Sequence, residues 1–469
     1  IGGITVAARN IISGNTSVGV LILGVGTTTN IVQGNYIGVN AAGTGPLGNG
    51  VYGIQIVSGA NNNTIGGPDG TTPGGPSTGA SNVISGNGSA GIDIRTTGNL
   101  VAGNYIGTNA TGMAALTNGL GITVFNSNNT IGGPTVAHRN VISGNSGMGV
   151  TVNAVGSVSA DGNIIQGNYI GVAADGNTVL GNSGVASVGV RVESHNVVGV
   201  TANNTQILGN VISGNAGTGP NSRVGIFIDD GTNGSNMPTG TVIKGNFIGT
   251  NAAGTAALTG QLIGVKLSDA ANSVIGGLTV AERNVISGNA GNGIEITGNG
   301  STGNLVQGNE IFGNASIGID LGATGVTAND VGDTDAGANN LQNFPLLTGV
   351  TAGNPVITGT LNSQANKAYT LEFFSNPAGN SQGQTFLGRT AVATDNNGNT
   401  AFTVILSTPV TEGQIVTATA TDLTGNTSEF SAGLAVTNGA LASFPLAIKV
   451  NGAGSGTVTS LPFGIDINP

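Results

Sequence analysis

The residues best suited to bind a metal ion lie in one short acidic stretch. Asp333 and Asp335 stand two positions apart ahead of Gly337, and Asp330 precedes them. Carboxylate oxygens around a glycine turn are the hard ligands that Ca²⁺ prefers, although this stretch lacks a full calcium-binding loop with its terminal Glu. We predict Asp330, Asp333 and Asp335 as candidate calcium ligands, with an ordinary polar linker as the alternative.

Two other sets of carboxylates are candidates for binding or cleaving a polysaccharide. Asp229 and Asp230 follow an apolar run, and we interpret them as a solvated turn at the end of a strand. Asp93, Glu295 and Asp320 occupy equivalent positions in a recurring phrase, Gly-Ile-x-Ile or a close variant, but in separate coils. Cleavage of polysaccharides needs carboxylates gathered on one surface. We therefore expect no dense acidic patch.

The two histidines offer no site either. His138 occupies a variable position, where other copies of its repeat have Ala8 and Glu282, so we interpret it as a turn residue. His195 lies in a Val-rich stretch without an evident partner. We predict no catalytic residue and no cofactor-binding residue, and calcium is the candidate ion.

The composition excludes several classes of protein. The chain has 469 residues, of which 86 are Gly and 7% are charged, and its net charge is −10. The 11 Lys and Arg residues are scattered, so no basic stripe exists for nucleic acid. No apolar run approaches the ~20 residues of a membrane helix. The absence of Cys excludes disulfides and thiolate metal sites.

Four short phrases recur along residues 1–325. The phrase Asn-Val-Ile-Ser-Gly-Asn, or a close variant, occurs at residues 10–15, 82–87, 140–145, 210–215 and 284–289. Gly-Asn-Tyr-Ile-Gly alternates with it, as at 103–107, and Gly-Ile-x-Ile and Thr-Ile-Gly-Gly follow. The coils that we predict begin at Asn10, Asn35, Asn82, Asn104, Asn140, Asn168, Asn210, Asn246, Asn284 and Asn309.

Each phrase is typical of a short strand with one buried and one wet face, because apolar and polar positions alternate. The middle position of Gly-Ile-x-Ile accepts residues of either charge, such as Arg191 and Glu295, so we expect it to face water. No coil can bury its Ile/Val face alone, so the coils must stack, with Asn ladders at the turns. We predict an all-β chain whose first part is a right-handed parallel β-helix; an antiparallel sandwich array is the alternative.

The pattern changes after Asp320. Strands are expected at residues 356–361, 368–374, 384–394, 400–406, 415–420 and 430–436. This number of strands in a short span predicts an Ig-like β-sandwich. The predicted domains are a β-helix at 1–325, an Asp/Asn/Gly-rich junction at 326–344, the sandwich at 345–437, and a tail at 438–469 that is a partial β-repeat or an exchanged strand.

The phrases Arg-Asn-Val-Ile-Ser-Gly-Asn at 139–145 and Gly-Asn-Tyr-Ile-Gly-Thr-Asn at 103–109 resemble those of bacterial right-handed β-helix repeat proteins of the cell surface or secreted space. The resemblance covers about residues 1–325. A β-sandwich commonly follows the helix in that family, and residues 369–376 and 418–422 resemble it. The resemblance implies a secreted, extracellular or cell-surface location.

These observations lead to one functional prediction and its rivals. We predict a non-enzymatic structural or adhesive protein of a bacterial surface or fibre. Its expected partners are other copies of itself, stacked head-to-tail because residues 1–3 begin in mid-coil, and surface polysaccharide. The main alternative is a carbohydrate-active β-helix enzyme, such as a lyase, hydrolase or epimerase, or a carbohydrate-binding module. Ice binding is a third.

Overall fold

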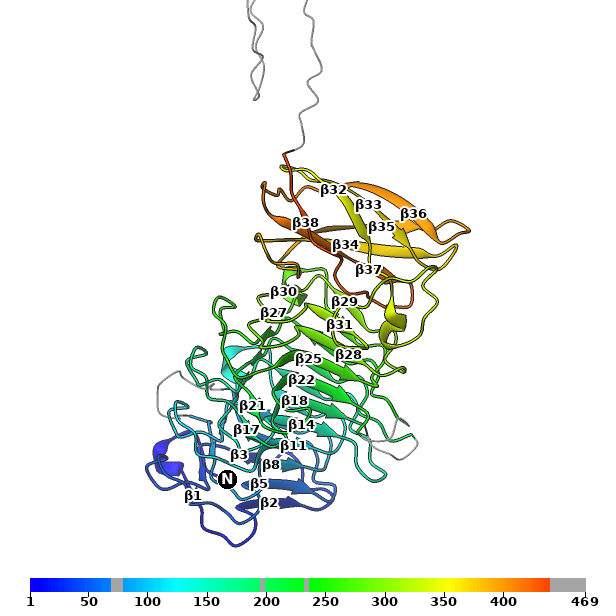
Figure 1. The fold of residues 1–469 in the computed structure, drawn as a ribbon. Coiled ribbons are helices and arrows are strands. Elements are labelled where there is room, and N and C mark those ends of the chain that lie inside the picture. Colours follow the sequence, from blue (N-terminus) through cyan, green and yellow to red (C-terminus); the bar gives the residue numbers. More distant parts are fainter. Residues whose placement is uncertain (69–78, 195–198, 232–235, 439–469) are drawn as a thin grey trace, which may run out of the picture.

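In the computed structural model, which describes residues 1–68, 79–194, 199–231 and 236–438, three long parallel sheets run side by side along most of the chain (Figure 1). The first consists of β1 (Ile11–Ile12), β4 (Tyr36–Ile37), β7 (Val83–Ile84), β10 (Tyr105–Ile106), β13 (Val141–Ile142), β16 (Tyr169–Ile170), β20 (Val211–Ile212), β24 (Phe247–Ile248), β27 (Val285–Ser287) and β30 (Glu310–Phe312). The second consists of β2 (Val20–Leu23), β5 (Ile54–Val57), β8 (Ala90–Ile94), β11 (Leu120–Val124), β14 (Val150–Asn153), β18 (Val188–Glu193), β22 (Val224–Asp229), β25 (Ile263–Ser268), β28 (Ile294–Thr297) and β31 (Ile319–Leu321). The third consists of β3 (Ile31–Val32), β6 (Thr64–Gly66), β9 (Leu100–Ala102), β12 (Thr130–Gly132), β15 (Ile164–Gln166), β19 (Gln206–Leu208), β23 (Val242–Lys244), β26 (Val274–Gly276) and β29 (Leu305–Gln307).

This arrangement confirms the all-β class and the parallel β-helix, and it excludes the antiparallel array for this part of the chain. Equivalent Ile and Val residues of successive coils stack inside the coils as one buried cluster that runs the length of the helix. Within the described ranges the helical segments are short 3₁₀ turns, η1 (Val6–Ala8), η2 (Val136–His138), η3 (Val280–Glu282) and η4 (Ala338–Leu341).

Buried asparagines join the coils at their corners, as predicted. Asn104 has no exposed surface, and its amide donates to Asn140 Oδ1 at 3.0 Å while its own Oδ1 accepts from Asn82 Nδ2 at 2.9 Å. The same contact repeats through all ten predicted coil starts, from Asn10 to Asn309. The ladder satisfies buried polar groups that would otherwise destabilise each turn.

A second apolar layer lies outside the first sheet. Tyr36, Tyr105 and Tyr169 pack there under loops that leave every second coil, and the loops hydrogen-bond to one another, for example Ala110 N to Gly43 O at 2.9 Å. Gly112 has φ +70°, and a Cβ at this residue would lie 2.4 Å from the Tyr105 ring. Glycine is therefore required where the loop covers the ring.

The C-terminal region contains two antiparallel sheets around one core. The first sheet consists of β32 (Leu346–Val350), β33 (Val356–Asn362) and β36 (Asn399–Ile405), and the second of β35 (Thr385–Ala393), β34 (Ala368–Asn376), β37 (Ile415–Asp422) and β38 (Leu434–Ala435). These strands agree closely with those expected, except that β32 was not expected and β38 is shorter than residues 430–436. Most of the predicted tail, residues 439–469, lies outside the described residues.

The antiparallel region covers the last coil of the β-helix (Figure 1). Ile311 of β30 pairs with Gly383, with N–O distances of 2.8 and 2.7 Å. The rings of Phe374 and Phe430 continue the apolar core of the coils. The C-terminal end of the β-helix is thus closed within the chain, and head-to-tail self-assembly stays a prediction.

Two buried carboxylates accept backbone hydrogen bonds at this junction. Glu372 Oε2 accepts from Gly308 N at 2.8 Å, and Glu429 accepts from Leu321 N and Thr327 N at 2.9 Å each. Burial raises the pKa of both Glu372 and Glu429 to about 7.

Among the described residues, no helix is long and apolar enough to cross a membrane.

Candidate functional site

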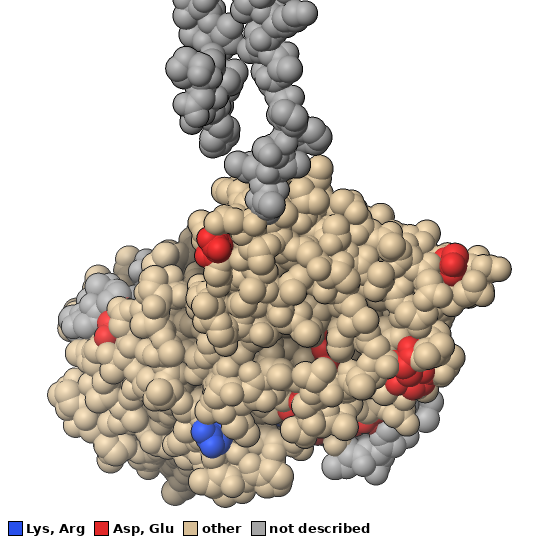
Figure 2. Space-filling model, turned by 45° about the horizontal axis from the view of Figure 1, so that its top comes forward, with Lys and Arg blue, Asp and Glu red and all other residues tan. Residues whose placement is uncertain are grey.

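Charged side chains are rare in this chain and widely separated over most of the face shown in Figure 2. They gather, however, on the outer face of the second sheet. Four charged residues and one aromatic residue form a row here, each directly opposite the next on successive strands from β18 to β31. They are Arg191, Phe227, Lys266, Glu295 and Asp320. Because neighbouring strands lie ~4.8 Å apart, their side chains are within reach of one another.

A groove of about 540 Å³ runs beside this row. Its wall is the segment 217–223, which follows the short extra pairing of β17 (Ser183–Gly184) with β21 (Ala216–Gly217). Lys266 and Glu295 line it, together with Asn221 and Arg223 from the wall. Strand register brings the first two together, whereas the wall comes from a separate loop.

Lys266 connects the sheet to the wall. Its Nζ lies 2.8 Å from Glu295 Oε1 and donates to Asn221 Oδ1 at 3.2 Å. Both side chains of the ion pair are largely covered, at 16% and 17% exposure, so water screens the pair only partly. The ammonium therefore holds the Glu295 carboxylate at a fixed place in the groove.

Asp320 stands beside Glu295, and one amide serves both. Asn292 Nδ2 donates to Glu295 Oε2 at 3.2 Å and to Asp320 Oδ2 at 2.6 Å. Asp320 is 3% exposed, and its burial, together with the nearby Glu295 charge, raises its pKa. Two carboxyl groups of unlike environment side by side are suited to proton transfer.

The expectation that the outward acids stand apart is therefore wrong for the pair Glu295 and Asp320, although the pair is not a dense acidic patch. Their coils are consecutive, because Ile294 of β28 pairs with Ile319 of β31. Asp93 lies far from them along the same row and pairs with Arg95 at 2.9 Å. Asp93 is also 1% exposed, so the middle position of the phrase points outward but does not always face water.

The interpretation of Asp229 and Asp230 as a solvated turn is also wrong. Asp229 ends β22 and is 4% exposed, and Asp230 is 8% exposed. Asp229 accepts two hydrogen bonds from the Arg191 guanidinium, whose Nε lies 2.9 Å from Oδ1, and Arg191 also pairs with Glu193 at 3.2 Å. Burial raises the pKa of Asp229, and Arg191 acts against that rise. This cluster braces the sheet next to the groove.

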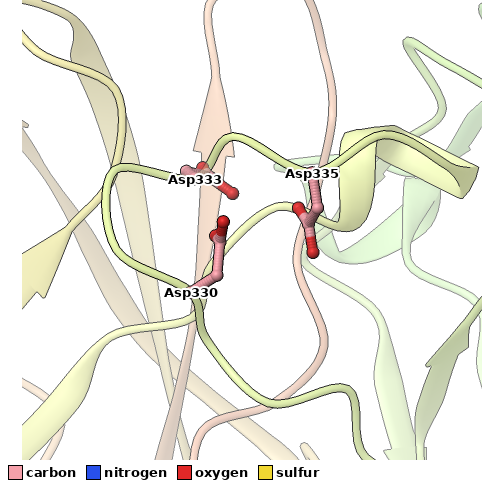
Figure 3. A group of neighbouring side chains, drawn as sticks. All are labelled: Asp330, Asp333 and Asp335. Atoms are coloured by element: carbon pink, nitrogen blue, oxygen red, sulfur yellow. The ribbon is translucent and has the colours of Figure 1, made fainter.

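The predicted calcium ligands lie together in the junction between β31 and β32. Asp330, Asp333 and Asp335 point toward one another, with one oxygen of each within 4.8 Å of the others (Figure 3). Within the part of the chain that the structure describes, Asp330 Oδ1 and Asp335 Oδ1 are buried without a hydrogen-bond partner. A buried, unpaired carboxylate oxygen is costly, and a bound cation would satisfy it.

Asp333 is the most firmly held of the three. Its carboxylate accepts from Asn343 N at 3.1 Å, from Gln342 Nε2 at 2.7 Å and from Ser363 Oγ. Burial raises the pKa of Asp333 to about 6, and the neighbouring acids add to the rise. The arrangement of three carboxylates can hold a hard divalent cation.

His138 lies outside both clusters. His138 ends η2, and its Nδ1 lies 2.8 Å from Thr135 Oγ1, as a turn residue would. His195 lies outside the described residues.

Comparison with known proteins adds distant structural neighbours. No family model matches the chain, and no curated protein matches its sequence significantly. One similar structure is the tailspike protein gp49 of Acinetobacter baumannii bacteriophage Fri1, a capsular polysaccharide depolymerase, with 10% identity and a TM-score of 0.23 over 87% of this chain and 77% of that one. Another is WceF of Pantoea stewartii, a glycan biofilm modifying enzyme with a tailspike-like parallel β-helix, with 10% identity and a TM-score of 0.18 over 91% of this chain and 59% of that one.

Both neighbours are described as enzymes that act on glycans. Neither description agrees with the prediction of a non-enzymatic structural or adhesive protein, which is corrected on this point; both agree with its carbohydrate-active alternative.

Proposed function

We propose that the chain is a carbohydrate-active enzyme that cleaves a polysaccharide in the groove on the outer face of the second sheet. The observation that carries the proposal is the pair Glu295 and Asp320, in register on β28 and β31 and joined by the Asn292 amide. A carboxyl group that lines a groove and is oriented by its neighbours can transfer a proton to a glycosidic oxygen.

The two acids have different roles in this proposal. Glu295 lines the groove and is the candidate catalytic residue, which transfers a proton to or from the bound sugar. Lys266 fixes its carboxylate from one side. Asp320 is buried behind it and acts as a positioning residue, because it shares the Asn292 donor and sets the local charge.

The groove also has the shape that a chain-like substrate needs. It is open and about 540 Å³ in volume, and amide and hydroxyl groups of its wall, such as Asn221 and Thr218, can bind sugar hydroxyls. We further propose that the substrate is a surface polysaccharide and that the protein works in an extracellular or surface setting. The repeat phrases support a bacterial origin, and the strand pattern supports an Ig-like class for the sandwich.

The test is an activity screen on bacterial extracellular polysaccharides, with new reducing ends as the readout. We expect Glu295→Gln to lower kcat roughly 100-fold or more, because the proton-transfer group is lost. Glu310→Gln, which removes a carboxylate from another sheet, is the matched control and should keep full activity. Asp320→Asn should lower activity and also move the pH optimum, which a purely structural role would not do.

A screen in which wild type and Glu295→Gln release reducing ends equally would contradict the proposal. So would glycan binding without turnover on every polymer, since that result would show a binding module instead of an enzyme.

We also propose a structural calcium site at Asp330, Asp333 and Asp335. The two buried carboxylate oxygens without hydrogen-bond partners support it. A cation there would tie together the segment that leads from β31 into β32.

A further inference from the structure

The wall of the groove carries an arginine in an unusual backbone conformation. Arg223 has φ +63°, in the left-handed region that favours glycine. Its N–H donates to Ser187 O at 2.9 Å, and its carbonyl accepts from Leu262 N at 2.6 Å. These contacts hold the strained conformation in place, and such strain is often retained at binding sites.

Arg223 is one of the residues that line the groove, and its guanidinium has five N–H donors. Its Nε donates to Gly260 O at 3.0 Å, which orients the planar group. Across residues 1–68, 79–194, 199–231 and 236–438, no carboxylate forms an ion pair with Arg223. A fixed guanidinium without a counter-ion is well suited to bind a carboxylate or sulfate group through two parallel hydrogen bonds.

The charge of the groove agrees with an anionic ligand. Among the charged residues that line the groove, Lys266 and Glu295 pair with each other and Arg223 adds one positive charge at the wall, while Asp320 lies buried behind Glu295. The whole chain carries a net charge of −10, so a positive charge in the groove stands out against the overall charge of the protein.

We infer that the groove takes an anionic glycan, and that Arg223 is the specificity-determining residue that binds the acidic substituent of a sugar ring. The inference rests on the proposed function, because it names the substrate class of the same groove. Amide groups of the wall bind the neutral hydroxyls, and Arg223 selects the charged ring.

The experiment measures binding to oligosaccharides that share a backbone but differ in charge. Its arms are a uronate-containing set, the same set after reduction of the carboxyl groups, a sulfated set and a neutral set. We expect wild type to bind the uronate or the sulfated set at least ~10-fold more tightly than the neutral counterpart, the difference typical of a charge-assisted contact. The two anionic arms show which substituent is bound.

Arg223→Gly is the informative variant, because glycine accepts the left-handed conformation and keeps the fold. It should lose the preference for anionic glycans while its Tm stays at or above that of wild type. Lys367→Gln removes an equal charge from an exposed site of the sandwich and should change nothing.

The outcomes separate the two proposals. Equal binding of charged and neutral sets by wild type, or an unchanged preference in Arg223→Gly, overturns the inference and leaves the proposed function standing. Failure of wild type to bind or cleave any glycan overturns both.

Discussion

Gln382 of the antiparallel region accepts the amide hydrogen of Asn314 at 3.1 Å. Its own amide donates back to Asn314 O at 2.7 Å. Asn314 is the last residue of a second corner ladder, which runs through Asn15, Asn49, Asn87, Asn118, Asn145, Asn182, Asn215, Gln261 and Asn289. Gln261 stands in the same ladder between Asn215 and Asn289. A residue from outside the coils thus completes a ladder that would otherwise end in unpaired groups.

This contact predicts a specific weakness at the junction. Gln382→Ala should remove the partner of the Asn314 backbone N–H and carbonyl in a buried place, while the Asn314 side-chain amide keeps its bond to Ile286 O, at a cost of about 2–3 kcal/mol. Limited proteolysis should then cut the junction before the β-helix. The exposed Ser381→Ala is the control, and equal protease resistance of Gln382→Ala and wild type would contradict the account.

The asparagine ladders should also contribute strongly to the free energy of unfolding of the β-helix. Asn104 makes hydrogen bonds to Asn140, Ile65 and Ala102 as a donor and to Asn82 as an acceptor. Asn104→Ala should lower the free energy of unfolding by about 3 kcal/mol or more, because several buried partners lose their bonds together. Denaturant unfolding measures the loss. Asn396→Ala, in an exposed turn, should cost less than about 0.5 kcal/mol.

The buried carboxyl groups of Glu372 and Glu429, where the antiparallel region meets the last coil, predict that the stability of the fold decreases as the pH rises toward neutral. Burial raises the pKa of Glu372 and Glu429 from 4.5 to about 7, so the folded chain holds these protons more tightly than the unfolded chain does. Their contribution is fully present below about pH 4.5 and is lost as the pH rises through 7, on the order of 3 kcal/mol for each group. Asp320 stands near Glu429, and Arg389 and Arg283 stand near Glu372 and oppose its shift.

Thermal unfolding between pH 5 and pH 8 checks this expectation, with Tm falling as the pH rises. Glu372→Gln and Glu429→Gln should each flatten the curve, whereas the exposed Glu412→Gln should not. A Tm that rises over this range, or parallel curves for all variants, would show that these groups do not carry the effect.

The acidic junction predicts a calcium-dependent Tm. Calcium at 100 times its Kd should stabilise the folded chain by about 2.7 kcal/mol relative to a chelator. The gain should shrink below pH 6, since the pKa of Asp333 is about 6 and a protonated carboxyl cannot bind the ion. Asp335→Asn should abolish the gain, and Asp395→Asn, at an exposed turn, should preserve it. A calcium shift that survives Asp335→Asn would place the ion elsewhere.

Much of the fold could be predicted from the repeats. The coil starts from Asn10 to Asn309 can be recognised in the sequence, because each coil places the same types of residue at its buried positions. The three junction acids were also visible, because their ligand atoms come from neighbouring positions of one loop.

The groove could not be predicted from the sequence, because it depends on which residues of different coils become neighbours. Which outward residues become neighbours depends on strand register across insertions of unequal length, so Glu295 and Asp320 seemed to be isolated acids. Asp93 and Asp229 are buried and bind side chains of neighbouring coils, Gln55 and Arg191, which lie 38 positions away in the sequence. The strained Arg223 has no signature in its residue type, because its conformation is imposed by Ser187 and Leu262.

The most direct test is a structure of the Glu295→Gln variant with an anionic oligosaccharide from a polymer that wild type cleaves. We expect the sugar to lie in the groove between residues 217–223 and the outer face of β25 and β28, with its acidic group on Arg223 and a glycosidic oxygen beside residue 295. A sugar bound instead in the cleft between the last coil and the antiparallel region, lined by Phe344 and Phe430, would contradict the assignment of the active site.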